Sequence, residues 1–333
     1  MQIKNSDKKF KDSDNAGRLE KYRKDASEES FLDELNSLIQ QLEPTELVSK
    51  ETVFPIVFVV GLPRSGTTIL TQLLSASLDV GIINNLIARF WLAPVTGIRL
   101  SKAILREQVN ISFKSDYGKT SDITEPHEFS YFWHYWLKME NMPPYNPEEV
   151  RDEIDWTGLA TTLRNMSAAW GKPLVMKAPD VAYHIEKIFD ILPETLFIHI
   201  YRDLADTAVS MRRSRLEYFG DENVWLGAYP NEYESIADLE GIKQIAAQAV
   251  CLNRMYKTAI DKITEKNVMS VHLNSLCENP LEIVRSIGRR ISELWHRDVN
   301  IKKIPPKSLK YSTYKGEKIY DQFLQEIEEY DLQ

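Results

Sequence analysis

Two kinds of hydrophobic spacing alternate along the chain after its first 50 residues. Residues 53–60 form an unbroken apolar run rich in β-branched side chains, typical of a strand buried on both faces of a parallel sheet. Residues 69–78 carry apolar positions at helical spacing. The same reading predicts strands at 173–177, 196–201 and 268–273, and helices at 181–192, 207–218, 236–263 and 280–294. Strands that alternate with helices predict an α/β fold, with a mainly parallel central sheet flanked by helices.

The N-terminal segment and one internal region depart from that alternation. The first 25 residues are charged, and we expect them to be mobile or loosely helical. Residues 31–42 have helical spacing, with Ser27 as the expected N-cap, and this helix is expected on the outside of the protein. Residues 84–170 have helical spacing and many aromatic residues, without a clear strand. We therefore expect a peripheral segment over the first 50 residues, and one domain over 51–333 with a mostly helical insertion at 84–170.

Composition narrows the class of protein. The chain has 333 residues, 43% of them hydrophobic, which is ample for a sizeable core. Its net charge of −8 argues against a nucleic-acid-binding protein. Cys251 and Cys277 lie far apart and form no disulfide framework, which fits a reducing compartment. The N-terminus lacks the apolar core of a signal peptide, and no apolar run reaches the roughly 20 residues of a membrane span. We expect a cytoplasmic protein with no membrane span.

A glycine-containing turn stands between the first predicted strand and its helix. The sequence GLPRSGTT, starting at Gly61, matches the phosphate-binding pattern G-x-x-x-x-G-K-[ST] except that Thr67 replaces the lysine. Backbone N–H groups at the helix start would point at an anion, and Arg64 would supply the missing positive charge. The alternative is a tight turn with threonine caps and a surface arginine. The residues expected to hold the anion are Arg64, Ser65, Gly66, Thr67 and Thr68.

A second candidate anion site follows the strand at 196–201. That strand ends in Arg202, and the next helix, for which Asp206 is the expected N-cap, carries Ser210 in its first turns. The arginine fork and the serine hydroxyl could converge on one dianionic group. The alternative is a solvated arginine and a serine on a helix face. Together, the two sites predict a ligand with phosphate-like groups at both ends.

Four short segments now resemble one enzyme family. They are the PRSGTT at 63–68, the pair Arg202 and Ser210 in an R-x₇-S spacing, the Lys-Ala-Pro at 177–179, and VHLNSLCENP at 271–280. In this order they resemble the motifs of the sulfotransferases that use 3′-phosphoadenylyl sulfate (PAPS). In that family the first loop holds the 5′-phosphosulfate, and the arginine and serine hold the 3′-phosphate.

The resemblance extends over about residues 53–294 and carries several implications. It implies a fold like that of P-loop nucleotide-binding proteins, and transfer of a sulfuryl group to a hydroxyl or amine without a metal ion. The donor would be PAPS, and the product adenosine 3′,5′-bisphosphate (PAP). The acceptor, bound on the side of the insertion at 84–170, could be a small molecule, a glycan, a lipid or a peptide.

The chain also departs from the cytosolic members of the family. Arg64 stands where those members have lysine, a pattern more similar to bacterial and tyrosyl-protein sulfotransferases. Ile69 replaces the tryptophan that packs on the adenine, and Pro179 stands in place of the catalytic histidine. Tyr314-Lys315-Gly316 resembles the clamp on the 3′-phosphate, which makes Lys315 a candidate ligand, with a surface loop as the alternative.

The proton acceptor must therefore lie elsewhere, and the resemblance points to an acidic turn on the acceptor side. Arg64 and Lys177 are the cations expected at the reacting group, although Lys177 could equally be a solvated strand end. Glu128 is the first choice as general base, with His127 and Glu125 as alternatives in the turn before a predicted helix. Burial against the apolar helix face, formed by Phe129, Phe132, Trp133 and Trp136, is expected to raise the pKa of Glu128. Alternatively, these acids only complement the helix dipole.

Two rival functions remain open. One is a P-loop kinase or NTPase with Asp203 as a metal ligand, and the other is a non-catalytic nucleotide-binding scaffold. No cluster of histidines, cysteines or carboxylates suggests a metal site. Arg212, Arg213 and Arg215 could attract an anionic acceptor or form a solvated helix face. Residues 218–234 could be a lid over the acceptor or an ordinary connection.

Overall fold

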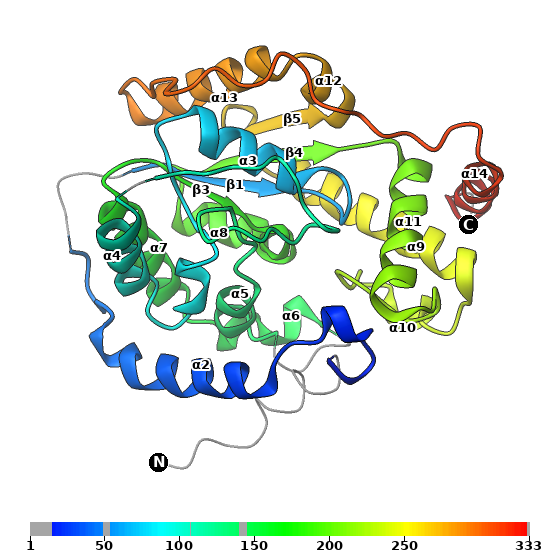
Figure 1. Cartoon of the computed structure of the whole chain (residues 1–333), viewed down its shortest axis with the longest axis horizontal. Helices are drawn as coiled ribbons and strands as arrows, with labels where there is room; N and C mark the ends of the chain where they lie inside the picture. Colours follow the sequence, from blue (N-terminus) through cyan, green and yellow to red (C-terminus); the bar gives the residue numbers. More distant parts are fainter. Residues whose placement is uncertain (1–14, 49–53, 107, 140–144, 332–333) are drawn as a thin grey trace.

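A five-stranded parallel sheet lies at the centre of the molecule (Figure 1). The computed structural model describes residues 15–48, 54–106, 108–139 and 145–331. The strand order is β2-β3-β1-β4-β5, and every neighbouring pair is parallel. The strands are β1 (Ile56–Val60), β2 (Gly81–Ile82), β3 (Leu174–Lys177), β4 (Leu196–Tyr201) and β5 (Val268–His272). The predicted α/β fold with a parallel sheet is confirmed, and β2, with two residues, is the strand that hydrophobic spacing did not predict.

Helices connect the strands and cover both faces of the sheet. The α-helices are α2 (Ala26–Ile39), α3 (Thr67–Ser77), α4 (Pro94–Leu105), α5 (Ser130–Trp136), α6 (Pro147–Val150), α7 (Trp156–Trp170), α8 (Ile185–Ile191), α9 (Leu204–Phe219), α10 (Tyr233–Ile236), α11 (Gly241–Asp261), α12 (Leu273–Glu278), α13 (Pro280–Trp295) and α14 (Lys318–Asp331). Short 3₁₀ turns are η1 (Glu20–Tyr22), η2 (Gln40–Leu42), η3 (Ile87–Arg89), η4 (Arg151–Glu153), η5 (Pro179–His184) and η6 (Glu265–Asn267). The helix expected at 181–192 is therefore divided into η5 and α8, and that at 236–263 into α10 and α11.

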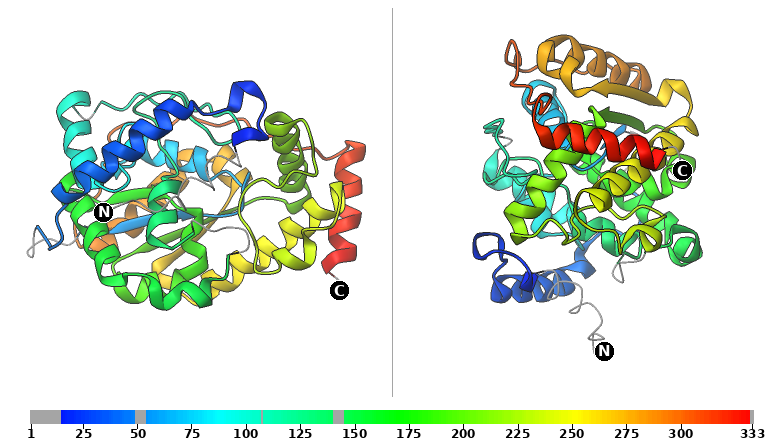
Figure 2. Two further views of the ribbon diagram at one scale, coloured as in Figure 1. Left: turned by 90° about the horizontal axis from the view of Figure 1, so that it is seen from below. Right: turned by 90° about the vertical axis from the view of Figure 1, so that its right-hand side faces the viewer.

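The central strand β1 contributes side chains to two separate cores. Its five residues are all fully buried, as expected of a strand covered on both faces. Val57 and Val59 join the core that α3 and α13 cover. Ile56, Phe58 and Val60 face the opposite core, which α5, α7 and α8 complete. Figure 1 shows these two sets of helices on opposite sides of the sheet. At one end of the sheet, α14 packs against α9 and α11 (Figure 2).

The N-terminal helix begins earlier than its hydrophobic spacing predicted. Asp25 is the N-cap, because its Oδ1 accepts hydrogen bonds from the N–H groups of Ser27 (2.8 Å) and Glu28 (3.2 Å). Ser27 lies inside α2, so the expected cap is wrong. Of the first 25 residues, expected to be mobile or loosely helical, residues 1–14 lie outside the described residues. Within the described part, Tyr22 is buried and stacks on Tyr218 at 4.1 Å between ring centroids.

Among its described residues, the region 84–170 contains four α-helices, and isolated bridges instead of strands. Its apolar side chains close one face of the main core, since Phe132 and Trp133 of α5 and Leu163 of α7 are fully buried. The segment between α4 and α5 has no regular structure over most of its length. That segment crosses the carboxyl ends of the strands, and it forms part of the site described next.

Candidate active site

A cleft with a volume of about 1600 Å³ opens at the carboxyl ends of the parallel strands. Ligands bind at this edge of open α/β sheets because the loops after the strands converge there. The loop after β1, the turn after β3 and Arg202 after β4 all line it. The N-terminal segment also contributes, through Arg18, Lys24 and Glu28. The helix at 31–42 was expected on the outside of the protein; the N-terminal segment that contains it also forms a wall of the cleft.

The loop between β1 and α3 requires glycine at two positions. A side chain at Gly61 would bring its Cβ within 2.3 Å of the Ile200 carbonyl oxygen. Gly66, the residue before α3, has a φ of 107°, and a Cβ there would lie 2.6 Å from the Leu273 side chain. These two close approaches press the loop against β4 and α12 and place the start of α3 at the cleft.

The start of α3 has open backbone donors. No group in the described ranges accepts a hydrogen bond from the N–H of Gly66, Thr67 or Thr68, as expected for the first turn of a helix. Thr67 and Thr68 line the cleft. Ser65 differs, because its N–H already donates to the Leu62 carbonyl at 3.1 Å and its side chain is not in the cleft lining. The Ser65 N–H is therefore engaged within the loop, whereas the N–H groups of the other three positions remain open.

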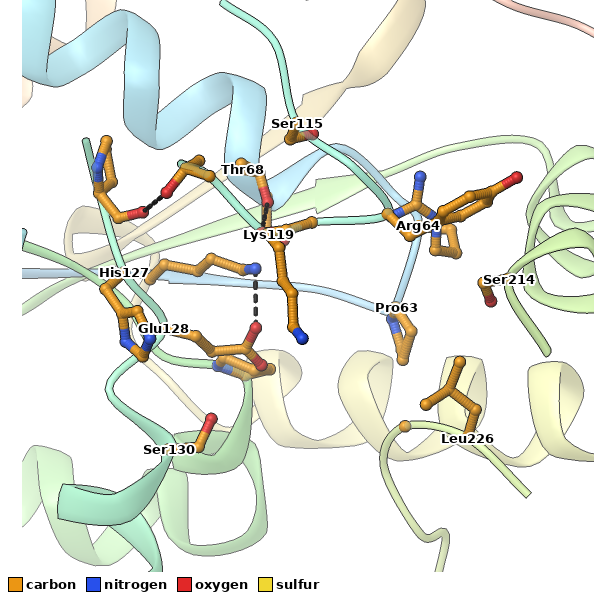
Figure 3. Close-up of a pocket in the computed structure, with 18 of the residues that line it drawn as sticks. Pro63, Arg64, Thr68, Ser115, Lys119, His127, Glu128, Ser130, Ser214 and Leu226 are labelled. Carbon is orange, nitrogen blue, oxygen red and sulfur yellow. Dashed lines mark hydrogen bonds and ion pairs between the residues drawn. The ribbon is translucent and has the colours of Figure 1, made fainter. Parts of the chain in front are cut away.

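Arg64 joins the two anion sites that the sequence predicts separately. Its Nε donates to Ser210 Oγ at 3.1 Å, and its guanidinium lies 5.1 Å from the ring centroid of Tyr117. Burial lowers the pKa of Arg64, partly opposed by the phenol of Tyr314. The usual pKa of an arginine lies so far above neutral pH that Arg64 keeps its charge. One cation therefore reaches both the α3 loop and the serine of α9, and Figure 3 shows Arg64 over the cleft opposite Glu128.

Arg202 lies against the C-terminal segment. Its Nη2 donates to the Ser312 carbonyl at 2.5 Å, and its guanidinium lies 5.8 Å from the ring centroid of Tyr311 and 5.4 Å from that of Tyr314. Its Nε is buried with no hydrogen-bond partner among the described groups. An orphaned charged donor at the cleft, which Ser210 also lines, fits an anionic ligand, because a buried donor without an acceptor is costly.

Asp206 holds that C-terminal segment in place. It is fully buried, and its carboxylate accepts from the Tyr314 N–H at 2.6 Å, from Thr313 Oγ1 at 3.2 Å and from the Tyr311 hydroxyl at 3.3 Å. Asp203, not Asp206, is the N-cap of α9, because its Oδ1 accepts from the Asp206 N–H at 2.9 Å. The predicted cap is wrong by three residues, and sequence reasoning missed the role that Asp206 has.

Lys315 does not lie among the residues that line the cleft. Its side chain is 63% exposed, and its Nζ lies 3.7 Å from Asp203 Oδ2. The structure therefore gives the surface-loop alternative for Lys315. Tyr314, the preceding residue, does line the cleft.

Lys177 and Glu128 form an ion pair on the cleft wall. Lys177 ends β3 and is 7% exposed, and its Nζ lies 2.7 Å from Glu128 Oε2, as drawn in Figure 3. Burial alone would raise the pKa of Glu128, but the charge and the hydrogen bond of Lys177 outweigh it and hold that pKa below its usual value. The expected rise in the pKa of Glu128 is wrong in this structure. Lys177 is not a solvated strand end.

The other two candidates for the base have different surroundings. His127 Nδ1 accepts a hydrogen bond from the Phe129 N–H at 2.8 Å, which leaves the ring proton on Nε2. Burial lowers the pKa of His127, opposed by Glu128, so the neutral ring is favoured. Glu125 is 1% exposed and accepts from Ser112 and Gln72, so it fixes the chain rather than facing the cleft. The helix after this turn begins at Ser130, later than predicted.

The segment 113–121 covers the α3 loop. The Gly118 carbonyl accepts from Thr68 Oγ1 at 3.5 Å. A methyl group added at Gly118 would lie 3.6 Å from both Arg64 Nη1 and Lys177 Nζ. Both cations therefore approach one point beneath this segment, close to the open N–H groups of α3. Hydrophobic spacing could not find this segment, because its place depends on contacts such as the 2.8 Å hydrogen bond from Tyr22 to Asp116.

Asp180 is a cleft residue that sequence reasoning missed. It lies three residues after Lys177, in η5, is partly buried, and makes no hydrogen bond or ion pair with any residue of the described ranges. Burial raises the pKa of Asp180 to about 7, with the charge of Glu128 adding to the rise and Lys177 opposing it. The available signal was its position directly after the Lys-Ala-Pro segment.

The remaining predicted features have structural roles or form cleft walls. Arg215 is fully buried and donates to Gln244 at 2.6 Å and to Gln248 at 2.8 Å, so it cannot meet an anionic acceptor. Residues 225–229 line the cleft, and Trp225 stacks on Tyr229 at 5.6 Å. Within the described ranges no group of three or more histidines, cysteines or carboxylates could hold a metal ion. No helix in the described part is long and apolar enough to span a membrane.

The sequence model of the sulfotransferase family matches residues 55–297. Among solved structures, the chain resembles sulfotransferase STF1 from Mycobacterium tuberculosis H37Rv, with 14% identity, a TM-score of 0.47, and 82% of this chain and 71% of that chain covered. It also resembles a sulfotransferase from Alicyclobacillus acidocaldarius, with 15% identity, a TM-score of 0.39, and coverage of 84% and 94%. No curated protein sequence matches the chain.

Proposed function

Since the chain belongs to the sulfotransferase family, we propose that it moves a sulfuryl group from PAPS to a hydroxyl or amine of an acceptor. The observation that carries this proposal is the convergence of two anion sites through Arg64, whose Nε donates to Ser210. A single nucleotide with phosphate at one end and phosphosulfate at the other would use both sites at once.

The donor's two charged ends have separate groups to meet. The phosphosulfate would bind at the start of α3, where the N–H groups of Gly66, Thr67 and Thr68 are open and the helix dipole favours an anion. The 3′-phosphate would bind at Arg202 and Ser210, and the orphaned Arg202 Nε supports this placement. Bound PAPS supplies an activated sulfuryl group, and the protein positions it.

Two cations would stabilise the charge that develops during transfer. Arg64 and Lys177 both approach the space beneath Gly118. Negative charge accumulates on the oxygen that leaves with the 5′-phosphate, and fixed cations in a partly dry site stabilise it without reorganising. Glu128 would keep Lys177 ionised and oriented through their 2.7 Å contact. Lys315 has no part in this arrangement.

A nucleotide titration tests the donor. Calorimetry should show that PAP binds ten- to a hundredfold more tightly than 5′-AMP, because a charge-assisted contact contributes about 1.5–3 kcal/mol. Arg202→Ala should remove most of that difference. Lys315→Ala is the matched control, since this lysine lies nearby but outside the cleft lining, and it should leave PAP affinity unchanged. Equal affinity of the wild-type protein for both nucleotides would refute the proposal.

The rival functions make different demands on the same residues. A kinase would use Asp203 as a metal ligand, yet Asp203 caps α9 with one oxygen and accepts from the Tyr320 hydroxyl at 3.2 Å with the other. Consumption of PAPS should therefore continue in excess EDTA. Activity that stops with the chelator and returns with Mg²⁺ would support the kinase. A binding scaffold would hold PAP but never consume PAPS.

We also propose a cytoplasmic location. Cys251 and Cys277 are buried and free, which fits a reducing compartment. The acceptor could be a small molecule, a glycan, a lipid or a peptide, and it would enter along the wall formed by the N-terminal segment and residues 225–229.

A further inference from the structure

Two carboxylates stand beside Lys177 on the wall of the cleft, and they differ in their partners. Glu128 is engaged by the lysine at 2.7 Å. Asp180 has no hydrogen bond or ion pair with any residue in the described ranges, although it is partly buried and lines the same cleft. The lone pairs of the Asp180 carboxyl group are therefore not taken up by another described group, and Asp180 lines a cleft that a ligand can enter.

The backbone that carries Asp180 is held firmly. The Ala178 N–H donates to the Val59 carbonyl at 3.1 Å, which ties the turn to β1. The Pro179 carbonyl accepts from the Tyr256 hydroxyl of α11 at 3.1 Å. The carboxyl group therefore projects from a fixed turn directly after the strand end that carries Lys177. A positioned group with free lone pairs is what general-base catalysis requires.

The groups around Asp180 come from four elements. Glu128 precedes α5, Lys177 ends β3, Tyr183 lies in η5 and Tyr256 lies in α11. Burial raises the pKa values of both tyrosines well above their usual range, so they stay neutral. The charge of Glu128 then acts on Asp180 and favours its protonated form. Two neighbouring carboxylates whose pKa values are pushed apart are typical of divided roles in catalysis.

We propose that Asp180 is the catalytic residue that takes the proton of the acceptor, and that Glu128 is a positioning residue that holds Lys177. The inference rests on the proposed function. In the transfer step, the acceptor O–H or N–H proton moves to an Asp180 carboxylate oxygen while the acceptor's lone pair forms a bond to sulfur. The bond between sulfur and the bridging oxygen breaks, and its electron pair leaves with the 5′-phosphate of PAP. Arg64 and Lys177 face that departing charge.

The catalytic test uses PAPS with water as the acceptor, so that it needs no identified acceptor. Asp180→Asn should slow the release of PAP from PAPS by at least a hundredfold, within the usual range for a lost general base of about 10²–10⁴. It should change PAP affinity, measured by calorimetry, by less than threefold. Asp190→Asn is the matched control, because Asp190 is exposed on α8 and outside the cleft lining, and it should behave as wild type.

The dependence of the rate on pH distinguishes the role of Asp180 from that of Glu128. The wild-type rate should rise with pH and level off above about 7, following the deprotonation of Asp180. Asp180→Asn should lose this rise. Glu128→Gln should keep it but move it to lower pH, because the charge of Glu128, which adds to the effect of burial on the pKa of Asp180, is gone. If Asp180→Asn stays within threefold of wild type, or if Glu128→Gln is the variant that loses the rise, the proposal is wrong.

A titration of the carboxyl groups by ¹³C NMR measures the protonation of Asp180 independently of turnover. In the wild-type protein with PAP, one aspartate carboxyl carbon, identified by its loss in Asp180→Asn, should titrate near pH 7. A midpoint below about 5 would overturn the role of Asp180, even in a protein that binds PAP. Failure of the wild-type protein to bind PAP would instead overturn the proposed function, so the two failures are distinguishable.

Discussion

The carboxylate of Asp206 holds the C-terminal segment that Arg202 contacts, and its removal should affect stability and, if the proposed function is right, nucleotide binding. It is fully buried and accepts three hydrogen bonds from residues 311–314. The same segment accepts from Arg202 through the Ser312 carbonyl. Asp206→Ala removes all three acceptors at once, so the segment should detach and Arg202 should lose its fixed position.

The size of the effect follows from these contacts. A hydrogen bond to a charged group contributes about 1.5–3 kcal/mol, and three independent bonds would give an upper limit of about 9 kcal/mol. The loss should be smaller, because Thr313 is exposed and the freed groups can bond to water. We expect the free energy of unfolding to fall by about 2–4 kcal/mol, and PAP affinity to fall about tenfold through the misplaced guanidinium.

Three measurements check this prediction. Urea unfolding followed by circular dichroism gives the loss of stability, and calorimetry gives the affinity for PAP. Hydrogen exchange should show faster exchange at Tyr314 and nearby amides, with the β-strands still protected. Asp321→Ala, at an exposed position of α14, is the control and should change neither quantity. A stability loss below about 1 kcal/mol with unchanged exchange at 311–314 would refute the reasoning.

Two further predictions concern buried cations and histidines. Arg215→Ala should lower the free energy of unfolding by about 3–5 kcal/mol, because it leaves Gln244 and Gln248 without their donor. Arg213→Ala removes only an exposed ion pair with Glu317, so in the same urea experiment it should lower the free energy of unfolding by less than about 1 kcal/mol. Burial lowers the pKa values of His184 and His199 to about 4, so the unfolded chain takes up protons that the folded protein does not. Stability should therefore fall as pH drops from about 6.5 to 4, by up to about 1.4 kcal/mol per pH unit for each histidine, and a flat series of urea midpoints would contradict this.

Most strands of the sheet could be predicted from the sequence, because they are unbroken apolar runs that are buried on both faces. Residues 196–201 match β4 in full. A two-residue strand such as β2 has too few positions to show any period, and its pairing with β3 depends on the fold around it. The N-cap residues of the helices were harder to predict. Asp25 and Ser27 are both good capping types, as are Asp203 and Asp206, and residue type does not say which one has extended backbone.

The properties of the site depended on contacts that span the chain. The pKa of Glu128 follows from Lys177, which lies on another element, so local burial against Phe129 gave the wrong direction. The function of Asp206 is set by a segment more than 100 residues later. By contrast, the positions of the α3 loop, Arg202 and Ser210 at the cleft could be predicted, because each lies at the end of a predicted strand or near the start of a predicted helix.

The single hydrogen bond from Arg64 to Ser210 has a thermodynamic consequence for the whole cleft. The two ends of a bound nucleotide would not be recognised independently, because one guanidinium is shared between them. A group bound at either anion site changes the position of Arg64, and so changes how Arg64 contacts a group at the other site. The coupling free energy must be equal in both directions. The free-energy costs of losing the 3′-phosphate from the ligand and of losing Arg64 from the protein should therefore not add. The protein would therefore discriminate between nucleotides by the spacing of their two charged groups, and not only by the charge at each end.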